Sequence, residues 1–220
     1  MRGEDLMNIA NNPEIERKCI KLIEAFKDLA THINKYFADI KNIITYWQHS
    51  LGPTHEFIPY ELIVPSISKE GKKLKTLTDA SKKSKNLISY GFNQNDELVM
   101  AIRNYGGDAD SLGMNVRFST KIDGKTYILN AHIFESSPNE SKLISACEIH
   151  SSETHTQYIS ITPPYDRYVR IDHKIDNRIV NTSTWATSWF KPLSYAFIYD
   201  ENDQLSEIMI DEHCHWSNKT

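Results

Sequence analysis

Cysteine is scarce in this sequence, which excludes a fold held together by disulfide bonds. The chain has 220 residues and three cysteines, Cys19, Cys147 and Cys214, which are odd in number and far apart. A disulfide framework requires more cysteines, in even number. We therefore expect reduced thiols and a cytoplasmic protein. Cys19 and Cys147 fall within apolar patterns, so both are expected to be buried small hydrophobic residues rather than nucleophiles.

Long apolar stretches are also missing. No run of 18 apolar residues occurs, so we expect no transmembrane helix and no membrane partner. The first residues, MRGEDLMNIANN, contain an arginine without an apolar core after it, which does not fit a secretory signal.

The chain lacks an overall excess of positive charge. Its formal charge is −4 and its pI is about 6.1, which argues against direct nucleic-acid binding. Residues 69–85 are the exception, with seven lysines, Glu70 and Asp79. This segment is either a solvated loop or a patch that attracts an anionic partner. No aromatic residue separates its lysines, so it does not resemble a platform for single-stranded nucleic acid.

Familiar catalytic motifs are absent. The sequence contains no nucleophile elbow, phosphate-binding loop, dinucleotide fingerprint or zinc-protease motif. Residues 105–113 are rich in Gly and Asp but lack the spacing of a calcium loop, so we expect an ordinary loop there.

Histidines near the C-terminus are candidate metal ligands. His213 and His215 flank Cys214 and would share one face of a strand, but a zinc site needs three or four ligands. His150 and His155 are the nearest other histidines, and their spacing in the sequence does not predict that they lie close to the C-terminal pair. A frayed, charged C-terminus is the simpler interpretation. We predict no metal and no cofactor.

The same histidines allow an enzymatic alternative. His150 and His215 are each followed within two residues by serine, as in phosphodiesterases that use two histidines. Such matches are expected by chance in a chain with nine histidines. A hydrolase or phosphodiesterase using His150, His155 or His215 is therefore kept as an alternative, while our first interpretation is that the protein is not an enzyme.

Residues 1–53 are expected to be helical. Asn12-Pro13 is a helix-start signal, and Leu51-Gly52-Pro53 is an end signal. Between them apolar residues recur with a repeat of about 3.5 residues: Ile15, Cys19, Leu22, Phe26, Leu29, Ile33, Tyr36, Ile40, Ile43 and Trp47. This stripe predicts a long helix, or a helical hairpin broken near residues 31–35, packed on a sheet. An oligomerising coiled coil is the third possibility.

Residues 54–86 form a predicted connector. Pro59 and Pro65 exclude a helix interior and a central strand, so its apolar residues lie in an edge strand or wrap against the core.

Residues 87–216 alternate between apolar and polar positions, with turn-forming residues in between. The turns fall at 93–96, 123–124, 151–153, 176–177 and 200–203. We count about ten strands in sequential hairpins. The predicted fold class is thus α+β: a helical N-terminal region on a large antiparallel meander sheet, together one domain.

Aromatic and acidic residues in this region are candidates for a binding surface. Trp and Tyr dominate binding hot spots, although they also fill cores. The candidate partner-binding residues are Tyr165, Tyr168, Trp185, Trp189, Asp200, Glu201, Asp203 and Glu207.

Two segments share a pattern. Residues 89–98 read SYGFNQNDEL, and residues 194–205 read SYAFIYDENDQL. The second resembles the Y-x-Y-D-x-x-G-x-L-x-x-I hairpins found in many immunity proteins of bacterial polymorphic toxin systems, with Asp203 in place of the usual Gly. The resemblance covers about 35 of the 220 residues, in the two hairpins that contain these segments.

The resemblance implies a cytoplasmic protein that neutralises one cognate toxin by covering its active site. Toxins of this kind are often basic nucleases, which an acidic inhibitor would attract. The resemblance assigns no individual binding residue, and the expected assembly is a monomer or homodimer.

Overall fold

The protein was analysed as a computed structural model that describes residues 11–64, 66–103, 113–164, 166–189 and 191–218. Tyr165 and most of the 105–113 segment lie outside the described residues. The chain forms two compact units. The first unit comprises Met1–Glu24 and Cys147–Thr220, and the second comprises Ala25–Ala146.

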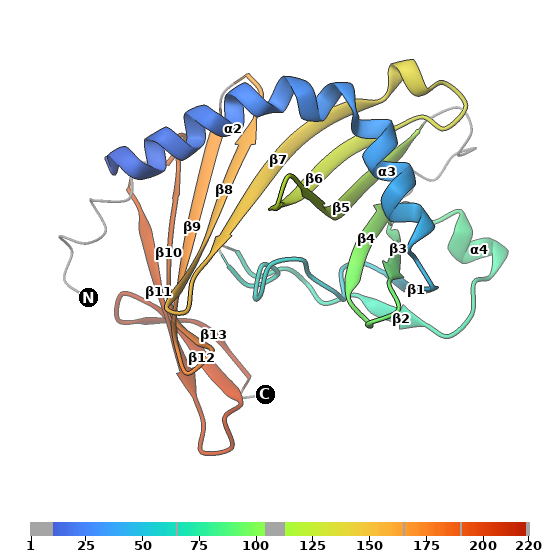
Figure 1. Cartoon of the computed structure of the whole chain (residues 1–220). Coiled ribbons are helices and arrows are strands. Elements are labelled where there is room, and N and C mark those ends of the chain that lie inside the picture. Colours follow the sequence, from blue (N-terminus) through green and yellow to red (C-terminus); the bar gives the residue numbers. More distant parts are fainter. Residues whose placement is uncertain (1–10, 65, 104–112, 165, 190, 219–220) are drawn as a thin grey trace. The chain divides into compact units, whose positions relative to one another are not determined.

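The strands form one antiparallel sheet with a nearly sequential order (Figure 1). It contains thirteen strands in the order β13-β12-β11-β10-β9-β8-β7-β6-β5-β4-β3-β1-β2. The α+β meander predicted from the sequence is confirmed, with thirteen strands in place of about ten. The three strands that were not predicted are β1 (Tyr46–Leu51), β2 (Lys72–Leu74) and β13 (His213–Ser217).

The N-terminal region contains two helices rather than one. α2 spans Pro13–Thr31, and α3 spans Ile33–Asn42, so the break at His32 lies inside the predicted window. The Asn12 side chain accepts a hydrogen bond from the Glu14 amide at 2.9 Å, as expected of a helix cap.

The prediction that the helix continues to Leu51 is wrong. Residues 46–51 form β1, which pairs with β3 over its whole length and with β2 at its end. The segment from Ile44 to Trp47 is β-branched and aromatic, which favours a strand. Trp47 fitted the helical stripe because an apolar residue in a strand can coincide with a helical repeat.

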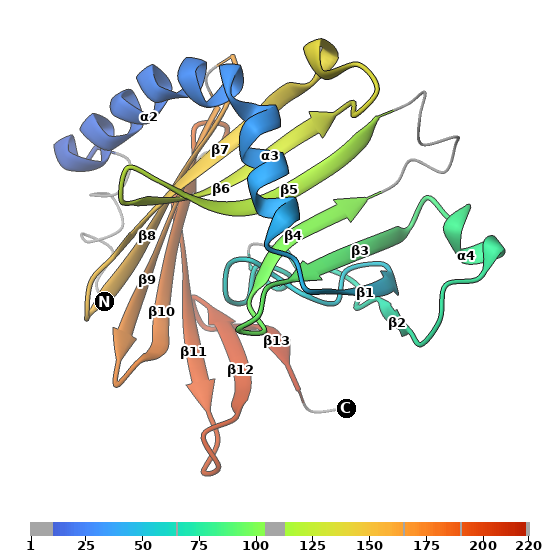
Figure 2. The same cartoon turned by 45° about the vertical axis from the view of Figure 1, so that its right-hand side comes forward.

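Most of the apolar stripe of the helices is buried, but Ile43 is exposed. The buried members are Ile15, Cys19, Leu22, Leu29, Ile33 and Ile40. In the first unit, Lys18 donates a hydrogen bond to Gln157 at 2.6 Å and Glu16 pairs with Arg167. In the second unit, α3 packs on β4 and β5 (Figure 2). The expected packing of helix on sheet is thus confirmed.

The second unit contains the connector and the first half of the meander. Its strands, besides β1 and β2, are β3 (Leu87–Phe92), β4 (Leu98–Arg103), β5 (Met114–Ile122), β6 (Lys125–Ile133) and the start of β7 (Lys142–Ser151), with the short helix η1 (Pro138–Glu140) before β7. Residues 57–64 form successive turns that bury Ile58 and Val64. The lysine-rich segment contains β2 and the short helix α4 (Asp79–Lys82).

The first unit contains the second half of the meander. Its strands, after β7, are β8 (His155–Thr162), β9 (Asp166–Ile175), β10 (Arg178–Ala186), β11 (Leu193–Tyr199), β12 (Leu205–Ile210) and β13. Asp176 and Asn177 connect β9 to β10 with φ angles of 49° and 64°, as a two-residue hairpin turn requires.

The two similar segments found in the sequence form the same turn. The Asn93 and Asp200 side chains each accept two backbone hydrogen bonds of 2.9–3.0 Å from the residues two and four positions later. Asp96 and Asp203 have φ angles of 59° and 63°, in the left-handed region. This backbone explains why glycine occupies the position of Asp203 in the hairpin pattern that the chain resembles.

Candidate binding surfaces

The predicted aromatic residues do not gather on one surface. Tyr168 meets Trp189 edge to face, with 5.9 Å between ring centroids. Trp185 pairs in register with Val169, whereas Tyr168 pairs with Ala186. Since successive residues of a strand point to opposite faces, Tyr168 and Trp185 lie on opposite sides of the sheet. Burial raises the pKa of Tyr168 far above its usual range, which fits a structural role.

The predicted acidic residues lie on one hairpin. Asp200, Glu201 and Asp203 are exposed in the turn between β11 and β12, while Glu207 is half-buried on β12 opposite Ile198. The Asp200 side chain holds the turn, and Asp203 forms an ion pair of 2.8 Å with Arg178. These side chains belong to a larger acidic region that continues into the last strand.

We define the acidic edge as residues 193–217, which form β11, β12 and β13. This stretch contains no Lys or Arg. Its six carboxylates are Asp200, Glu201, Asp203, Glu207, Asp211 and Glu212. β13 ends the order of the sheet, so one side of it has no neighbouring strand among the described residues. The acidic edge therefore combines negative charge with an open strand edge.

The candidate histidines have separate local surroundings. His150 lies 3.4 Å from the Glu148 carboxylate, and His155 contacts the Ser152 hydroxyl at 2.9 Å within its own turn. His215 packs edge to face on Tyr195. Over the described ranges, no group of three or more His, Cys, Asp or Glu residues is arranged to hold a metal ion.

The C-terminal tail differs from the frayed end that the sequence suggested. His213–Ser217 form β13, which pairs antiparallel with β12 and has a register shift at Ile208/Met209. The crowded His and Cys residues therefore belong to a paired strand. Cys214 is exposed there, whereas Cys19 and Cys147 are buried as expected, and none of the three forms a disulfide bond. Burial raises the pKa of Cys19.

A buried ion pair lies on β9 in the first unit. Arg170 and Asp172 have exposed fractions of 1% and 0%. The Arg170 Nε and Nη2 atoms donate to Asp172 at 2.7 and 3.1 Å, and the Thr182 hydroxyl donates to the same carboxylate at 2.7 Å. Arg170 also lies 5.7 Å from the centroid of the Tyr158 ring. This saturated arrangement is typical of a structural network.

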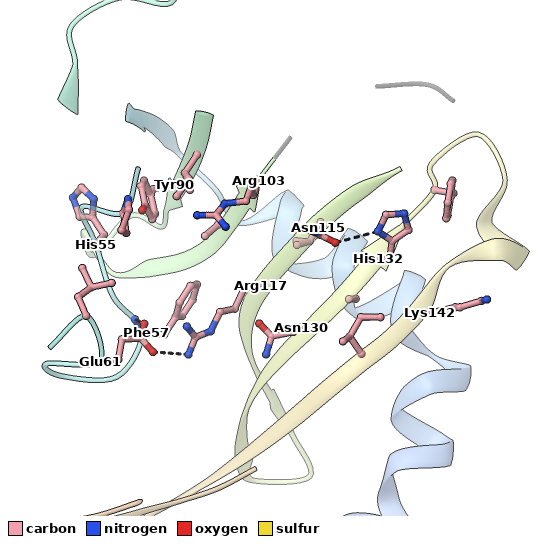
Figure 3. Close-up of a pocket in the computed structure, with 18 of the residues that line it drawn as sticks. His55, Phe57, Glu61, Tyr90, Arg103, Asn115, Arg117, Asn130, His132 and Lys142 are labelled. Carbon is pink, nitrogen blue, oxygen red and sulfur yellow. Dashed lines mark hydrogen bonds and ion pairs between the residues drawn. The ribbon is translucent and has the colours of Figure 1, made fainter. Parts of the chain in front are cut away.

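The second unit contains a cavity of about 1160 Å³ that the sequence analysis missed (Figure 3). Its floor consists of two rows of cross-strand neighbours, taken from β3 to β6 in register. One row is Ile88, Arg103, Asn115 and His132, and the other is Tyr90, Ala101, Arg117 and Asn130.

The opposite face of the same strands explains why this one is polar. Met100, Phe118 and Leu129 are cross-strand neighbours on that face and have no exposed surface. Alternation on β5 and β6 therefore sends Phe118 and Leu129 to the core and the polar residues of the two rows to the cavity. Asn115-x-Arg117 followed by Asn130-x-His132 was the sequence signal that could have revealed the floor.

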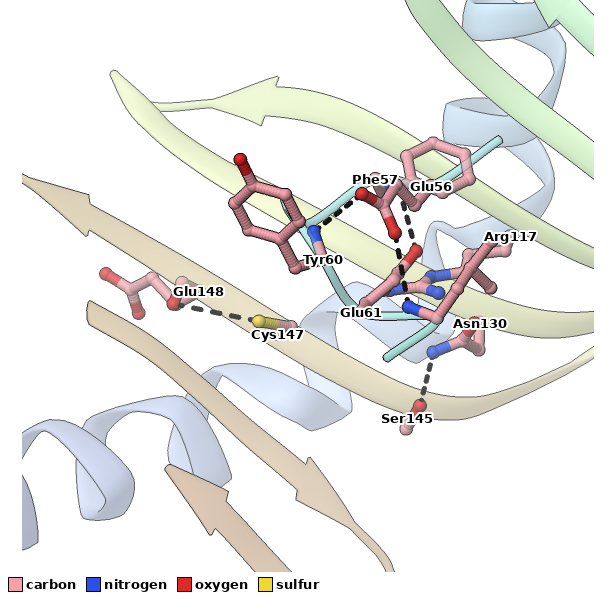
Figure 4. A network of polar contacts seen from close by, with 10 residues as sticks. Glu56, Phe57, Tyr60, Glu61, Arg117, Asn130, Ser145, Cys147 and Glu148 are labelled. Carbon is pink, nitrogen blue, oxygen red and sulfur yellow. Dashed lines mark hydrogen bonds and ion pairs between the residues drawn. The ribbon is translucent and has the colours of Figure 1, made fainter. Parts of the chain in front are cut away.

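One wall of the cavity is the 53–64 segment, whose fold depends on two glutamates (Figure 4). Glu56 accepts hydrogen bonds from the amides of Tyr60 and Leu62 at 2.6 and 3.1 Å. Glu61 accepts one from the amide of Phe57 at 2.8 Å and another from Arg117 at 2.7 Å. The wall is thus joined to the floor by an ion pair.

Aromatic contacts complete this attachment. The Arg117 guanidinium lies 5.1 Å from the centroid of the Phe57 ring, and His55 stacks at an angle on Tyr90 with 4.7 Å between centroids. Burial, with a smaller contribution from Lys73, lowers the pKa of His55. Burial thus favours the neutral form of the His55 imidazole.

On the far side, the cavity is bounded by Phe134 and residues 139–144. Phe134 packs edge to face on His132, with 4.7 Å between ring centroids. His132 lies 3.1 Å from the Asn115 side-chain oxygen. Gly113 fits closely against this pair, because a Cβ there would lie 2.7 Å from His132 and 3.0 Å from Phe134.

In the described part of the chain, no helix has the length and apolar character needed to cross a membrane. Comparisons of the chain with protein-family models, with curated proteins and with solved structures found no match.

Proposed function

We propose that this protein is an immunity protein, which binds a cognate protein toxin in the cytoplasm and neutralises it by covering its active site. The observation that carries the proposal is the acidic edge, with six carboxylates and no Lys or Arg over β11–β13. The hairpin of residues 194–205, which resembles those of immunity proteins, lies within this edge.

Electrostatics favours a basic partner on this surface. Glu201 and Glu212 are exposed, and neither makes a hydrogen bond or ion pair with the described residues. Their charges therefore remain available to a partner's Lys and Arg residues. Complementary charge accelerates encounter and selects the partner, while buried aromatic contacts supply most of the affinity. A basic nuclease domain has the chemistry that this surface would attract.

The test is co-expression of the protein with the product of the adjacent gene, followed by size-exclusion chromatography and measurement of the dissociation constant. We expect a toxic neighbour, a stable complex and rescued growth. The double substitution Glu201→Lys/Glu212→Lys should weaken the complex by about tenfold or more, because it turns attraction into repulsion.

A matched control is Glu24→Lys/Glu153→Lys, which makes the same charge change at exposed positions outside the acidic edge. We expect this variant to bind within about threefold of the wild type. A toxic neighbour that forms no complex, or a neighbour of an unrelated kind, contradicts the proposal. Equal losses of affinity in the two double variants would show that the acidic edge is not part of the interface.

A further inference from the structure

We propose that the cavity of the second unit binds a small organic monoanion, a carboxylate attached to an apolar body about the size of one or two rings. This inference is independent of the proposed toxin binding, because the acidic edge belongs to the other unit. It depends on the charges, the apolar surfaces and the size of the cavity.

The cationic end of the cavity contains two guanidinium groups. Arg103 pairs in register with Asn115, and Arg117 with Ala101, so the two arginines are diagonal neighbours on adjacent strands. Diagonal neighbours have Cα atoms about 7–8 Å apart, within reach of two long side chains that act on one ligand. Figure 3 shows both side chains on the cavity side of the sheet.

Neither arginine is saturated. Among the residues that the structure describes, the Arg103 side chain makes no hydrogen bond or ion pair. Arg117 uses Nη2 on Glu61, but its Nε is buried without an acceptor in the described chain. A buried N–H group without an acceptor is costly, and a ligand oxygen would remove that cost. Planar guanidinium groups bind carboxylates with two parallel hydrogen bonds.

The balance of charge favours a monoanion. The ionised groups of the lining are Arg103, Arg117, Lys142, Glu61 and Glu140, which leave one net positive charge when the histidines are neutral. A dianionic phosphate would be undercompensated in this setting, and it would also lie near the Glu61 carboxylate. A carboxylate of charge −1 matches the cavity.

The remaining lining suits an apolar body. Phe57, Tyr90 and Phe134 present rings from three sides, and Leu62 and Ile144 add aliphatic surface. Ile144 has an exposed fraction of 46%, high for a large apolar side chain. Small-molecule sites typically have volumes of about 300–1,000 Å³ and combine such surfaces with a few convergent polar groups. The cavity, at about 1160 Å³, is large enough for a ring system.

The experiment uses calorimetry on the full chain with three probes that share one ring system. Naphthoate is a monocarboxylate, naphthalenemethanol is neutral, and naphthyl phosphate is a dianion near neutral pH. We expect naphthoate to bind with a Kd below about 1 mM, and the other two probes to bind at least about tenfold more weakly.

Three variants locate the site. Arg103→Gln removes a guanidinium at an exposed position and should weaken naphthoate binding about tenfold to a hundredfold, without lowering the unfolding temperature. Lys121→Gln, on the same face of β5 but outside the cavity, should change binding less than about twofold. Ala101→Leu fills the floor between Tyr90 and Arg117 and should abolish binding of every probe.

Several outcomes overturn the inference. Equal dissociation constants for naphthoate and naphthalenemethanol would show that the charge of the ligand does not contribute to binding. Tighter binding of naphthyl phosphate would contradict the monoanion. Equal effects of Arg103→Gln and Lys121→Gln on naphthoate affinity would show that the cavity is not the binding site. No binding of any probe at about 10 mM would show the same. Failure here leaves the toxin proposal standing, because that proposal is tested with a different partner and other residues.

Discussion

Asp172 is the residue on which the buried network of the first unit depends, because it accepts hydrogen bonds from both Arg170 and Thr182. Asp172→Ala would leave the Arg170 guanidinium buried without its counter-ion. Breaking a buried pair in this way costs about 3–5 kcal/mol. We therefore expect the free energy of unfolding, measured in urea, to fall by that amount.

The control for this measurement is Asp166→Ala at the start of the same strand. Asp166 is exposed and lies 3.4 Å from the Thr187 hydroxyl, so its loss should cost less than about 0.5 kcal/mol. If the two variants lose the same stability, the Arg170–Asp172 pair does not stabilise the fold as described.

His49 and His55 make stability depend on pH. Burial lowers the pKa of both histidines in the folded protein, so the unfolded chain takes up protons first as the pH falls. Their contribution is complete above about pH 6.5, the unfolded value, and is lost as the pH falls from there toward the lowered folded values. Urea unfolding at about pH 7 and pH 5.5 should show this loss.

The double substitution His49→Asn/His55→Asn should reduce the loss of stability between the two pH values. His213→Asn, at an exposed position on β13, should leave the difference unchanged. An unaltered pH dependence in the double variant would show that carboxylates alone cause the loss. The direction of the two pKa shifts would then be wrong.

At the scale of elements, the contact between β1 and β2 depends on Gly71. A Cβ at Gly71 would lie 2.3 Å from the backbone carbonyl carbon of Gly52, and Gly71 also donates to the Pro53 carbonyl at 2.7 Å. Backbone cannot move aside easily, so Gly71→Ala should reduce the free energy of unfolding by about 3 kcal/mol, at the top of the usual range for overpacking.

Gly91→Ala provides the comparison. A Cβ there would lie 2.5 Å from the end of the Ile44 side chain, which can rotate. This variant should lose at most about 1 kcal/mol in the same urea measurement. A Gly91 variant as unstable as the Gly71 variant would contradict the distinction between backbone and side-chain clashes.

Elements could be predicted from the sequence where the residue types of a short segment determine its backbone conformation. The turns at Asp123-Gly124, Asp176-Asn177 and residues 200–203 were found because left-handed backbone restricts which residues fit. β1 was missed because its apolar residues continued the helical stripe. β2 and β13 were missed because they are short and polar, and their pairing with a neighbouring strand stabilises them.

The cavity was harder to predict than the strands. Asn115, Arg117, Asn130 and His132 look like ordinary solvent-facing residues of alternating strands. Their meeting depends on the register of β4, β5 and β6, and on the 53–64 segment, whose turns are fixed by Glu56 and Glu61 across short distances. The repeat of apolar residues in the sequence determines neither the register of the strands nor the path of the 53–64 segment.

At the scale of the whole molecule, charge is unevenly distributed. Residues 69–85 have a net charge of +5, so the rest of the chain has −9. If a basic toxin is the partner, its association rate constant should fall about tenfold or more between 50 and 500 mM salt, whereas the dissociation rate should change little. Stopped-flow mixing checks this expectation, and a rate insensitive to salt would contradict steering by charge.

The order of the strands bears on how the chain acquires its structure during synthesis. From β3 to β13, each strand lies beside its predecessor in the chain. During synthesis, each new strand can therefore pair with the strand that precedes it, before later residues are made. Such local pairing keeps contact order low and favours rapid folding. β13 follows the other twelve strands in the chain, so its edge of the sheet is completed after all of them have been made.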